Sequence, residues 1–231
     1  MNPAKKPHTE PCSTNDYTNR TMSVKIAVTD CHVVSRDGSR IGFLQRGSGP
    51  GLVLVQGAMG TAHYFDDFAD ALSTSFTVYT MDRRGRGSSP KPYTSTHNIA
   101  RDVEDIDAIL AETGASRVFG LSSGAMITLE AARTLPRVTQ AAVYEPPAYR
   151  HGLWHDGIQA LNSQIERGDI CLALFTAAII MGFVPSWMRR LPNPIARLLG
   201  AAALWAAERR PRPGAEVRDL LPSIRYGLHL I

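Results

Sequence analysis

The stretch RVFGLSSGAMI, residues 117–127, decides the fold of this chain. It begins as a short apolar run and continues, through Gly-Leu-Ser-Ser-Gly, into a helix-like pattern. Gly120, Ser122 and Gly124 fit the pattern G-x-S-x-G, in which the small residues permit a sharp turn that holds the serine above a sheet. We therefore predict that Ser122 is a nucleophile. The alternative is an ordinary turn between a strand and a helix.

Short apolar runs alternate with helical patterns on both sides of this stretch. The expected strands are residues 52–57, 76–82, 117–122 and 140–145. The expected helices are residues 61–73, 97–113 and 123–135. Nearly continuous apolar runs are typical of parallel strands that are covered on both faces. The alternation therefore predicts right-handed crossovers and an α/β fold with a doubly wound, mostly parallel sheet.

The chain divides into three expected regions. Residues 1–22 are expected to be a disordered N-terminal extension; alternatively, translation starts at Met22 and residues 1–21 are not translated. Residues 23–150 are expected to form the α/β core, which opens with an antiparallel hairpin around the turn at Asp37-Gly38. Residues 151–231 are a series of helical patterns broken by prolines. We expect these helices to form a cap over the carboxyl ends of the strands, where open α/β sheets bind ligands.

The composition is that of a soluble, folded protein. The 231 residues are 44% hydrophobic and 20% charged, and the net charge is +4. Arginines gather near the C-terminus, where solvated helix faces are a simpler explanation than an anionic partner such as nucleic acid. The N-terminus has no apolar core, and the longest apolar stretch, residues 171–184, is shorter than the roughly 20 residues of a spanning helix. We therefore predict neither a secretory signal nor a membrane segment.

The three cysteines, Cys12, Cys31 and Cys171, are odd in number and lack the spacing of metal ligands. Neither a disulfide framework nor a zinc site is therefore predicted. A reducing cytoplasm fits this pattern. No cofactor is indicated, because the glycine spacing matches neither a dinucleotide nor a P-loop fingerprint. The same mismatch disfavours a nucleotide-binding α/β protein.

Two further loops follow expected strands. The first, Gln56-Gly57-Ala58-Met59-Gly60, comes directly after LVLV. Acyl transfer needs two backbone N–H groups aimed at a developing oxyanion; one belongs to the residue after the nucleophile and the other to an earlier loop. We therefore expect Ser123 and Ala58 to be the oxyanion donors. The second loop, residues 82–89, lacks phosphate-loop spacing and is interpreted as a structural turn.

Four segments together resemble a known family. They are LVLVQGAMG, MDRRGRGSS, FGLSSGAM and AAVYEPP, in that order. Their order and spacing are similar to those of the α/β-hydrolase fold superfamily, in the subgroup of small bacterial hydrolases with a helical cap, over residues 24 to about 150. The resemblance implies a Ser-acid-His triad with Ser122 as nucleophile, acting on a small, apolar ester or acyl compound. One departure is Gln56, where the family usually has histidine; a backbone oxyanion donor should tolerate this change.

The chain also departs from the family at its end. The two closing strands, with the usual acid and the catalytic histidine, are not recognisable before Ile231, so we expect a truncated chain that is weakly active or inactive. Glu145 is the candidate acid, with a structural role in the following Pro-Pro turn as the alternative. The candidate bases, none at the family's position, are His151, His155 and His229.

A second hypothesis is a non-catalytic, α/β-hydrolase-like module that keeps the pocket and binds a small ligand. Its pocket is expected to be apolar, because the cap region is rich in Leu, Ala, Ile and Trp. Reaction of Ser122 with a fluorophosphonate distinguishes the two hypotheses, since it requires an activated serine. The identity of the substrate and the oligomeric state are left open.

Overall fold

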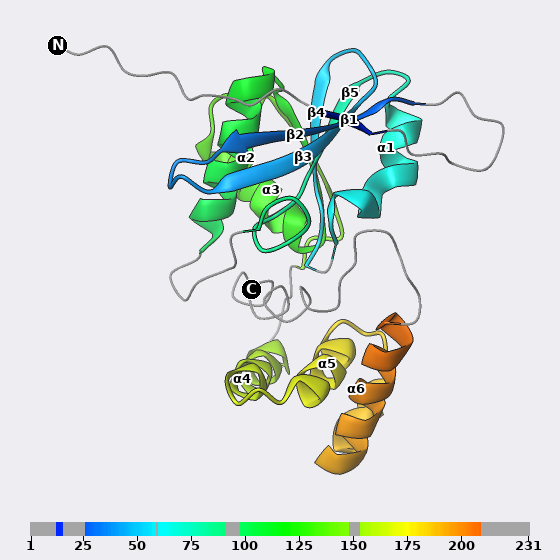
Figure 1. Cartoon of the computed structure of the whole chain (residues 1–231). Coiled ribbons are helices and arrows are strands. Elements are labelled where there is room, and N and C mark those ends of the chain that lie inside the picture. The colour runs from blue at the N-terminus through cyan, green and yellow to red at the C-terminus, as the bar shows by residue number, and fades with distance from the viewer. Residues whose placement is uncertain (1–12, 16–25, 59, 91–97, 148–152, 209–231) are drawn as a thin grey trace. The chain divides into compact units, whose positions relative to one another are not determined.

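A computed structural model describes residues 13–15, 26–58, 60–90, 98–147 and 153–208 (Figure 1). Contacts divide the chain into two compact units, of which the first ends at Pro147 and the second begins at Ala148. The predicted boundary after residue 150 stays a prediction. Each unit is described by itself.

A seven-stranded sheet forms the centre of the first unit. The strands are β1 (Ser13–Asn15), β2 (Val28–Val34), β3 (Arg40–Arg46), β4 (Gly51–Val55), β5 (Thr77–Met81), β6 (Arg117–Leu121) and β7 (Gln140–Tyr144). Their order is β1-β2-β3-β5-β4-β6-β7. Strands β5, β4, β6 and β7 run parallel to one another, whereas the pairs β1–β2, β2–β3 and β3–β5 are antiparallel. The sheet confirms the predicted α/β class and the hairpin that opens it.

Helices connect the parallel strands and cover both faces of the sheet (Figure 1). They are η1 (Ala62–Phe65), α1 (Asp66–Leu72), α2 (Ile99–Thr113) and α3 (Ser123–Thr134). Figure 1 shows α1 on one face and α2 with α3 on the other. The three predicted helices are therefore confirmed, although the first is divided into a 3-10 turn and an α-helix.

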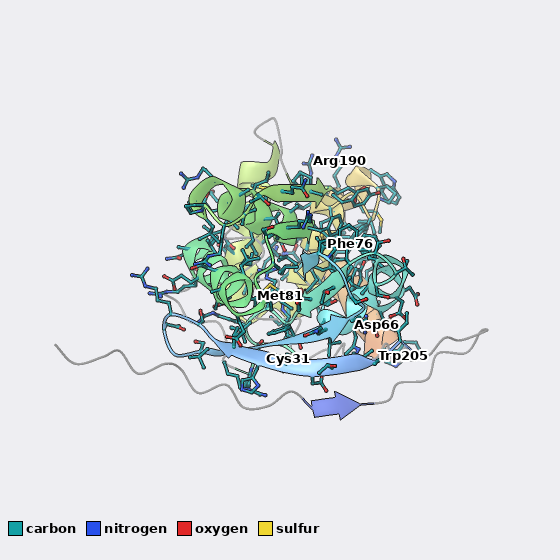
Figure 2. The ribbon with its side chains drawn as sticks, turned by 90° about the horizontal axis from the view of Figure 1, so that it is seen from above. Cys31, Asp66, Phe76, Met81, Arg190 and Trp205 are labelled. Atoms are coloured by element: carbon teal, nitrogen blue, oxygen red, sulfur yellow. The ribbon has the colours of Figure 1, made fainter. Side chains whose placement is uncertain are left out.

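Alternate residues of β4 explain why the strands are apolar throughout. Val53 and Val55 belong to the core cluster that includes α2 and α3, whereas Leu54 packs with Phe65 of η1 on the opposite face. Successive side chains of a strand point to opposite faces, so a strand with helices on both sides must be apolar at every position. Met81 of β5, also fully buried, lies among the side chains in the middle of this unit (Figure 2).

Strand β7 differs from the expectation of a strand covered on both faces. All five of its residues are exposed, and Tyr144 is exposed by 58%. The reason is its place in the order: among the described strands it pairs only with β6 and ends the sheet. An apolar edge strand of this kind is a site for pairing with further backbone.

The described part of the second unit, residues 153–208, contains four helices. They are α4 (Leu153–Glu166), α5 (Ile170–Ile180), η2 (Ser186–Arg190) and α6 (Asn193–Glu208). Leu161 of α4 packs on Ala173 and Ala177 of α5, while Phe175 packs near Ala196 of α6. None of the helices described here combines the length and the apolarity needed to cross a membrane. The predicted series of helices is confirmed over the described part; residues 209–231 lie outside it.

One cysteine departs from the prediction that the chain has no disulfide framework. Cys31, on β2 (Figure 2), is disulfide-bonded, whereas Cys171 is free. Cys12, the remaining cysteine of the sequence, lies outside the described residues. Disulfides are more typical of oxidising compartments than of the cytoplasm. The predicted absence of a disulfide is therefore corrected, and the cytoplasmic location stays a prediction that this bond disfavours.

A buried arginine ties three elements of the first unit together. Arg84, in the loop after β5, donates from Nε and Nη2 to the two oxygens of Asp105 on α2, at 2.7 and 2.6 Å. Its Nη1 donates to Asp37 Oδ2 and to Ser39 Oγ in the hairpin turn, at 2.7 and 2.8 Å. Burial raises the pKa of Asp105, against the hydrogen bonds from Arg84. The same guanidinium holds the pKa of Asp37 well below its usual range.

We predict that Asp105→Asn destabilises the first unit, because it leaves part of a buried guanidinium without its counter-charge. Removing one partner of a buried pair costs about 3 kcal/mol. Urea unfolding at neutral pH measures the change. The matched control is Glu130→Gln, which breaks the exposed pair with Arg133 on α3 and should leave the unfolding midpoint unchanged. Equal midpoints for the two variants would contradict the structural role of Arg84.

Candidate active site

Ser122 lies at the turn between β6 and α3. Its backbone has φ 54° and ψ −122°, a conformation that non-glycine residues rarely adopt. Two hydrogen bonds hold this strain: Ser122 N–H donates to Tyr144 O at 2.9 Å, and Ala125 N–H donates to Ser122 O at 2.8 Å. Strained backbone conformations of this kind cluster at active sites. The structure thus has the local geometry that the predicted elbow requires.

The two glycines of the motif are explained by close packing. A side-chain carbon at Gly124 would collide with Val55 O and lie 2.6 Å from Gln56 O, at the end of β4. A side-chain carbon at Gly120 would lie 2.7 Å from Ala125 Cα in the first turn of α3. Only glycine therefore allows α3 to start directly beside two neighbouring strands.

The strand order brings Ser122 next to the predicted oxyanion loop. Strands β4 and β6 are parallel neighbours with Val55 opposite Gly120, so the segments that follow them leave the sheet side by side. From β4 the chain crosses to β5 on one side, whereas β6 lies on the other; ligands bind at such switch points. A methyl group placed on Gly57 would lie 3.3 Å from Ser122 Cβ and 3.8 Å from its Oγ. Ala58 follows directly, and Ser123 is the first residue of α3.

Two buried arginines, Arg83 and Arg86, contact these segments. The interpretation of residues 82–89 as a structural turn did not predict these contacts. Arg86 Nη1 donates to Gly57 O at 2.9 Å and to Gly60 O at 3.1 Å. Arg83 Nη1 donates to Ser123 Oγ at 3.0 Å, and its Nε lies 3.4 Å from Asp102 Oδ1. A signal was present, because arginines directly after a buried strand need partners if they are buried.

Gln56 carries the departure from the family pattern. Its side chain is fully buried, yet neither atom of its amide has a hydrogen-bond partner among the described residues. Its Cβ and Cγ pack against Gly60, where a side-chain carbon would lie 3.2 and 3.1 Å from them. The side chain therefore lies against the predicted oxyanion loop.

The predicted acid lies near Ser122, whereas the predicted bases lie in the second unit or outside the described residues. Glu145 is exposed, has φ 49°, and follows Tyr144, whose carbonyl binds Ser122 N–H; the two backbones are therefore adjacent. Of the candidate bases, His151 and His229 lie outside the described residues, and His155 lies in α4 of the second unit. The Ser122 hydroxyl makes no hydrogen bond with any residue that the structure describes. The roles predicted for these residues stay predictions.

His63 belongs to a separate charged cluster after the predicted oxyanion loop. Its Nδ1 lies 3.0 Å from Asp66 Oδ2, and Asp66 also pairs with the buried Arg46. The hydrogen bond to Asp66 raises the pKa of His63, against the effect of burial. Although burial acts in the other direction, hydrogen bonds from His63 and Arg46 lower the pKa of Asp66.

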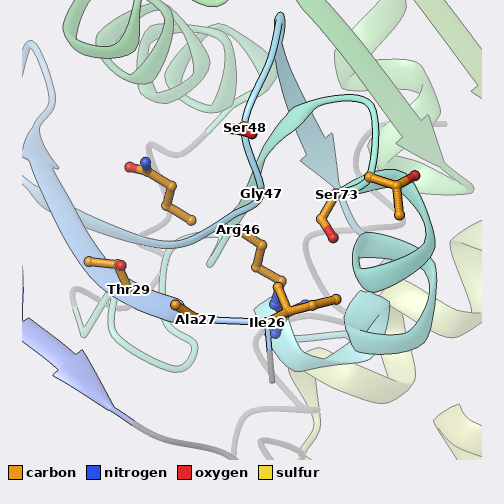
Figure 3. A pocket seen from close by; sticks show the side chains of 9 residues that line it. Ile26, Ala27, Thr29, Arg46, Gly47, Ser48 and Ser73 are labelled. Atoms are coloured by element: carbon orange, nitrogen blue, oxygen red, sulfur yellow. The ribbon is translucent and has the colours of Figure 1, made fainter. Parts of the chain in front are cut away.

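An open hollow of about 540 Å³ lies elsewhere in the first unit (Figure 3). Its lining residues are Ile26, Ala27, Thr29, Gln45, Arg46, Gly47, Ser48, Ser73 and Thr74. Residues 46–48 precede β4 and residues 73 and 74 precede β5, so the hollow is at the amino ends of the parallel strands. Ser122 is at the carboxyl end of β6, which separates this hollow from the candidate active site.

Comparison with known proteins identifies the family. The family model "Alpha/beta hydrolase family" matches residues 52–230, more than half of the chain. This chain belongs to the alpha/beta hydrolase family. The match includes the predicted elbow, the predicted oxyanion loop and residues 82–89, and it confirms the family resemblance of the sequence.

Two curated relatives and one solved structure are similar to the chain. An uncharacterized hydrolase, YraK of Bacillus subtilis, is 36% identical over 40% of this chain and 35% of its own length. The 2-(acetamidomethylene)succinate hydrolase of Mesorhizobium japonicum is 30% identical over 53% of this chain and 46% of its own. The crystal structure of an alpha/beta hydrolase from Sphaerobacter thermophilus is 34% identical, with a TM-score of 0.60 over 75% of this chain and 71% of that one. The chain thus spans less than half the length of these two curated relatives.

We predict that Gly124→Ala disrupts the elbow, because the new methyl group has no space beside the carbonyls that end β4. Overpacking of this kind costs about 2 kcal/mol or more. The matched control is Gly157→Ala in α4, where the new carbon meets only the tip of the Ile180 side chain, at 3.3 Å. Thermal unfolding of both variants measures the difference, and a Gly124→Ala variant as stable as the native chain would contradict this packing.

The pKa shift of His63 predicts a pH-dependent contribution to stability. Because its folded pKa is raised above the usual value of about 6.5, protonated His63 stabilises the fold fully below that pH, and the contribution is lost as the pH rises through the raised pKa. We expect His63→Gln to be more destabilising at pH 5.5 than at pH 9, by about 1 kcal/mol or less because solvent screens the pair. Urea unfolding in a double-mutant cycle with Asp66→Asn isolates the pair; a coupling that does not change with pH would contradict the expectation.

Proposed function

We propose that the chain is part of a serine hydrolase that cleaves a small ester or related acyl compound. Ser122 is the proposed nucleophile, and the backbone N–H groups of Ala58 and Ser123 are the proposed oxyanion donors. The observation that carries the proposal is the strained Ser122 at the strand switch point, with Gly57 packed against its Cβ. Membership of the family and the names of the two curated hydrolases support it.

The proposed reaction follows from this arrangement. Ser122 Oγ attacks the carbonyl carbon of the substrate and gives its proton to a general base. The carbonyl oxygen becomes an oxyanion, which the two N–H groups stabilise. The tetrahedral intermediate then collapses as the base gives its proton to the leaving oxygen, so that the alcohol departs and the acyl-serine remains. Water then attacks the acyl-serine in the same manner and releases the acid. One curated relative is named a 2-(acetamidomethylene)succinate hydrolase, so amides are included among the proposed substrates.

The base and the acid are the remaining parts of the proposal. Glu145 is the proposed acid, because its backbone is adjacent to Ser122 through the hydrogen bond of Tyr144. A histidine is the proposed base, and His229 would give the chain order Ser122, Glu145, His229. Without a working histidine, turnover falls on the order of a million-fold, leaving only the contribution of the oxyanion hole and of binding.

A non-catalytic ligand-binding module is the second candidate. The observation that favours it is the Ser122 hydroxyl, which has no hydrogen-bond partner in the described part of the chain. Such a module keeps the fold and the pocket but has an unactivated serine. It also binds a small acyl compound without turning it over.

The two candidates differ in the reactivity of Ser122. For a hydrolase we expect a fluorophosphonate probe to label the native chain once and Ser122→Ala to abolish labelling, since the probe needs an activated serine. The matched control is Ser48→Ala, in the hollow of Figure 3, which should leave labelling unchanged. Mass spectrometry identifies the modified residue. No labelling, together with no hydrolysis of p-nitrophenyl acetate or p-nitroacetanilide, would favour the ligand-binding module.

A further inference from the structure

The Gly57–Ala58 peptide group is the feature from which a further role follows. A trans peptide is planar, and its C=O and N–H point in opposite directions. The carbonyl of this peptide belongs to Gly57 and its N–H to Ala58, the proposed oxyanion donor. Any group that holds the carbonyl therefore also decides where the Ala58 N–H points.

Arg86 is that group. Its Nη1 donates to Gly57 O at 2.9 Å, and the same nitrogen donates to Gly60 O at 3.1 Å, so one guanidinium joins both sides of the loop. The side chain is only 2% exposed, which removes competition from water. Hydrogen bonds from a charged donor are about twice as strong as neutral ones. The carbonyl of Gly57 is thus fixed toward Arg86, and the Ala58 N–H is fixed away from it.

The turn that carries Arg86 is itself held in place. Ser89 N–H donates to Arg86 O at 2.8 Å, and Gly85 N–H donates to Ser89 O at 2.8 Å. Asp82, which begins the loop, accepts from Ser88 N–H at 2.9 Å and from Ala62 N–H at 2.6 Å. The last bond also joins the loop to η1, just beyond Gly60. The guanidinium therefore extends from a rigid base and needs no substrate to reach its position.

We propose that Arg86 is a positioning residue that keeps the Gly57–Ala58 peptide in the orientation required by the oxyanion hole. The inference rests on the proposed function, because it gives the Ala58 N–H its role. When Arg86 is lost, the peptide is free to rotate so that the Gly57 carbonyl turns toward the site. A carbonyl oxygen there repels an oxyanion instead of stabilising it.

The test compares Arg86→Gln and Arg86→Lys with the native chain in reaction with a fluorophosphonate. We expect the maximal rate of inactivation, kinact, to fall about 100-fold in Arg86→Gln, which is the effect of losing one oxyanion donor. The probe concentration that gives half of this rate, KI, should stay unchanged. Arg86→Lys should fall less, about tenfold, because a lysine keeps the charge but presents no planar fork to two carbonyls. Arg40→Gln is the matched control. Arg40 is exposed, and its Nη1 donates to Ser88 O at 3.5 Å, in the loop of residues 82–89 that also carries Arg86.

Amide hydrogen exchange of residues 57–61 distinguishes a positioning role of Arg86 from a general loss of folded structure. The peptide that covers residues 57–61 should exchange faster in both Arg86 variants, while peptides from β4 and β6 keep their native protection. Unchanged exchange in the loop would overturn the inference. The inference would also be overturned if kinact fell by no more than the fraction of unfolded protein accounts for. A change in KI with kinact unchanged would overturn it as well.

The same experiment distinguishes this inference from the proposed function. If the native chain is not labelled at all, the proposed function fails, and the positioning role of Arg86 in catalysis fails with it. Faster exchange of residues 57–61 in the Arg86 variants would then show only that Arg86 holds this loop in place. If the native chain is labelled and Arg86→Gln is labelled equally fast, the proposed function stands and the inference is overturned.

Discussion

The contact between the first turn of α3 and the end of β4 is the constraint on which the rest of the candidate site depends. At Gly124 the helix backbone lies so close to the carbonyls of Val55 and Gln56 that no side chain fits between them. This contact sets where α3 begins, directly after Ser122, whose φ of 54° is rare for a residue other than glycine. The same contact brings the loop after β4 alongside the serine. The proposed nucleophile and the proposed oxyanion loop are therefore placed by backbone packing alone.

The three arginines after β5 hold the elements around that contact. Arg84 joins the hairpin turn to α2, Arg83 reaches Ser123 at the start of α3, and Arg86 holds the loop after β4. Burying a guanidinium costs free energy unless it is fully hydrogen-bonded and paired. Here hydrogen bonds to backbone carbonyls and to carboxylates of neighbouring elements offset this cost. One short loop thus links the outer hairpin of the sheet with both segments of the candidate site.

The strand order gives these local contacts their functional meaning. Because β4 lies between β5 and β6, the chain crosses to one side of the sheet after β4 and to the other side after β6, and open α/β sheets bind ligands at such switch points. The hollow of Figure 3 is at the amino edge, among residues that precede β4 and β5, and takes no part in this arrangement. At the other end of the order, the exposed β7 places Glu145 beside Ser122 through a single backbone hydrogen bond.

The sequence by itself determined the strands, the helices and the elbow. Alternating apolar runs and helical patterns are local signals, and the G-x-S-x-G spacing fixes a turn within five residues, so Ser122, Ser123 and the loop of Ala58 could be predicted. Only the tertiary structure decided the partners of Arg83 and Arg86, the disulfide of Cys31, and the exposure of β7. These depend on which strands become neighbours. Contacts between residues 26 to 40 positions apart along the chain leave no periodic pattern, and it is the strand order that brings them together.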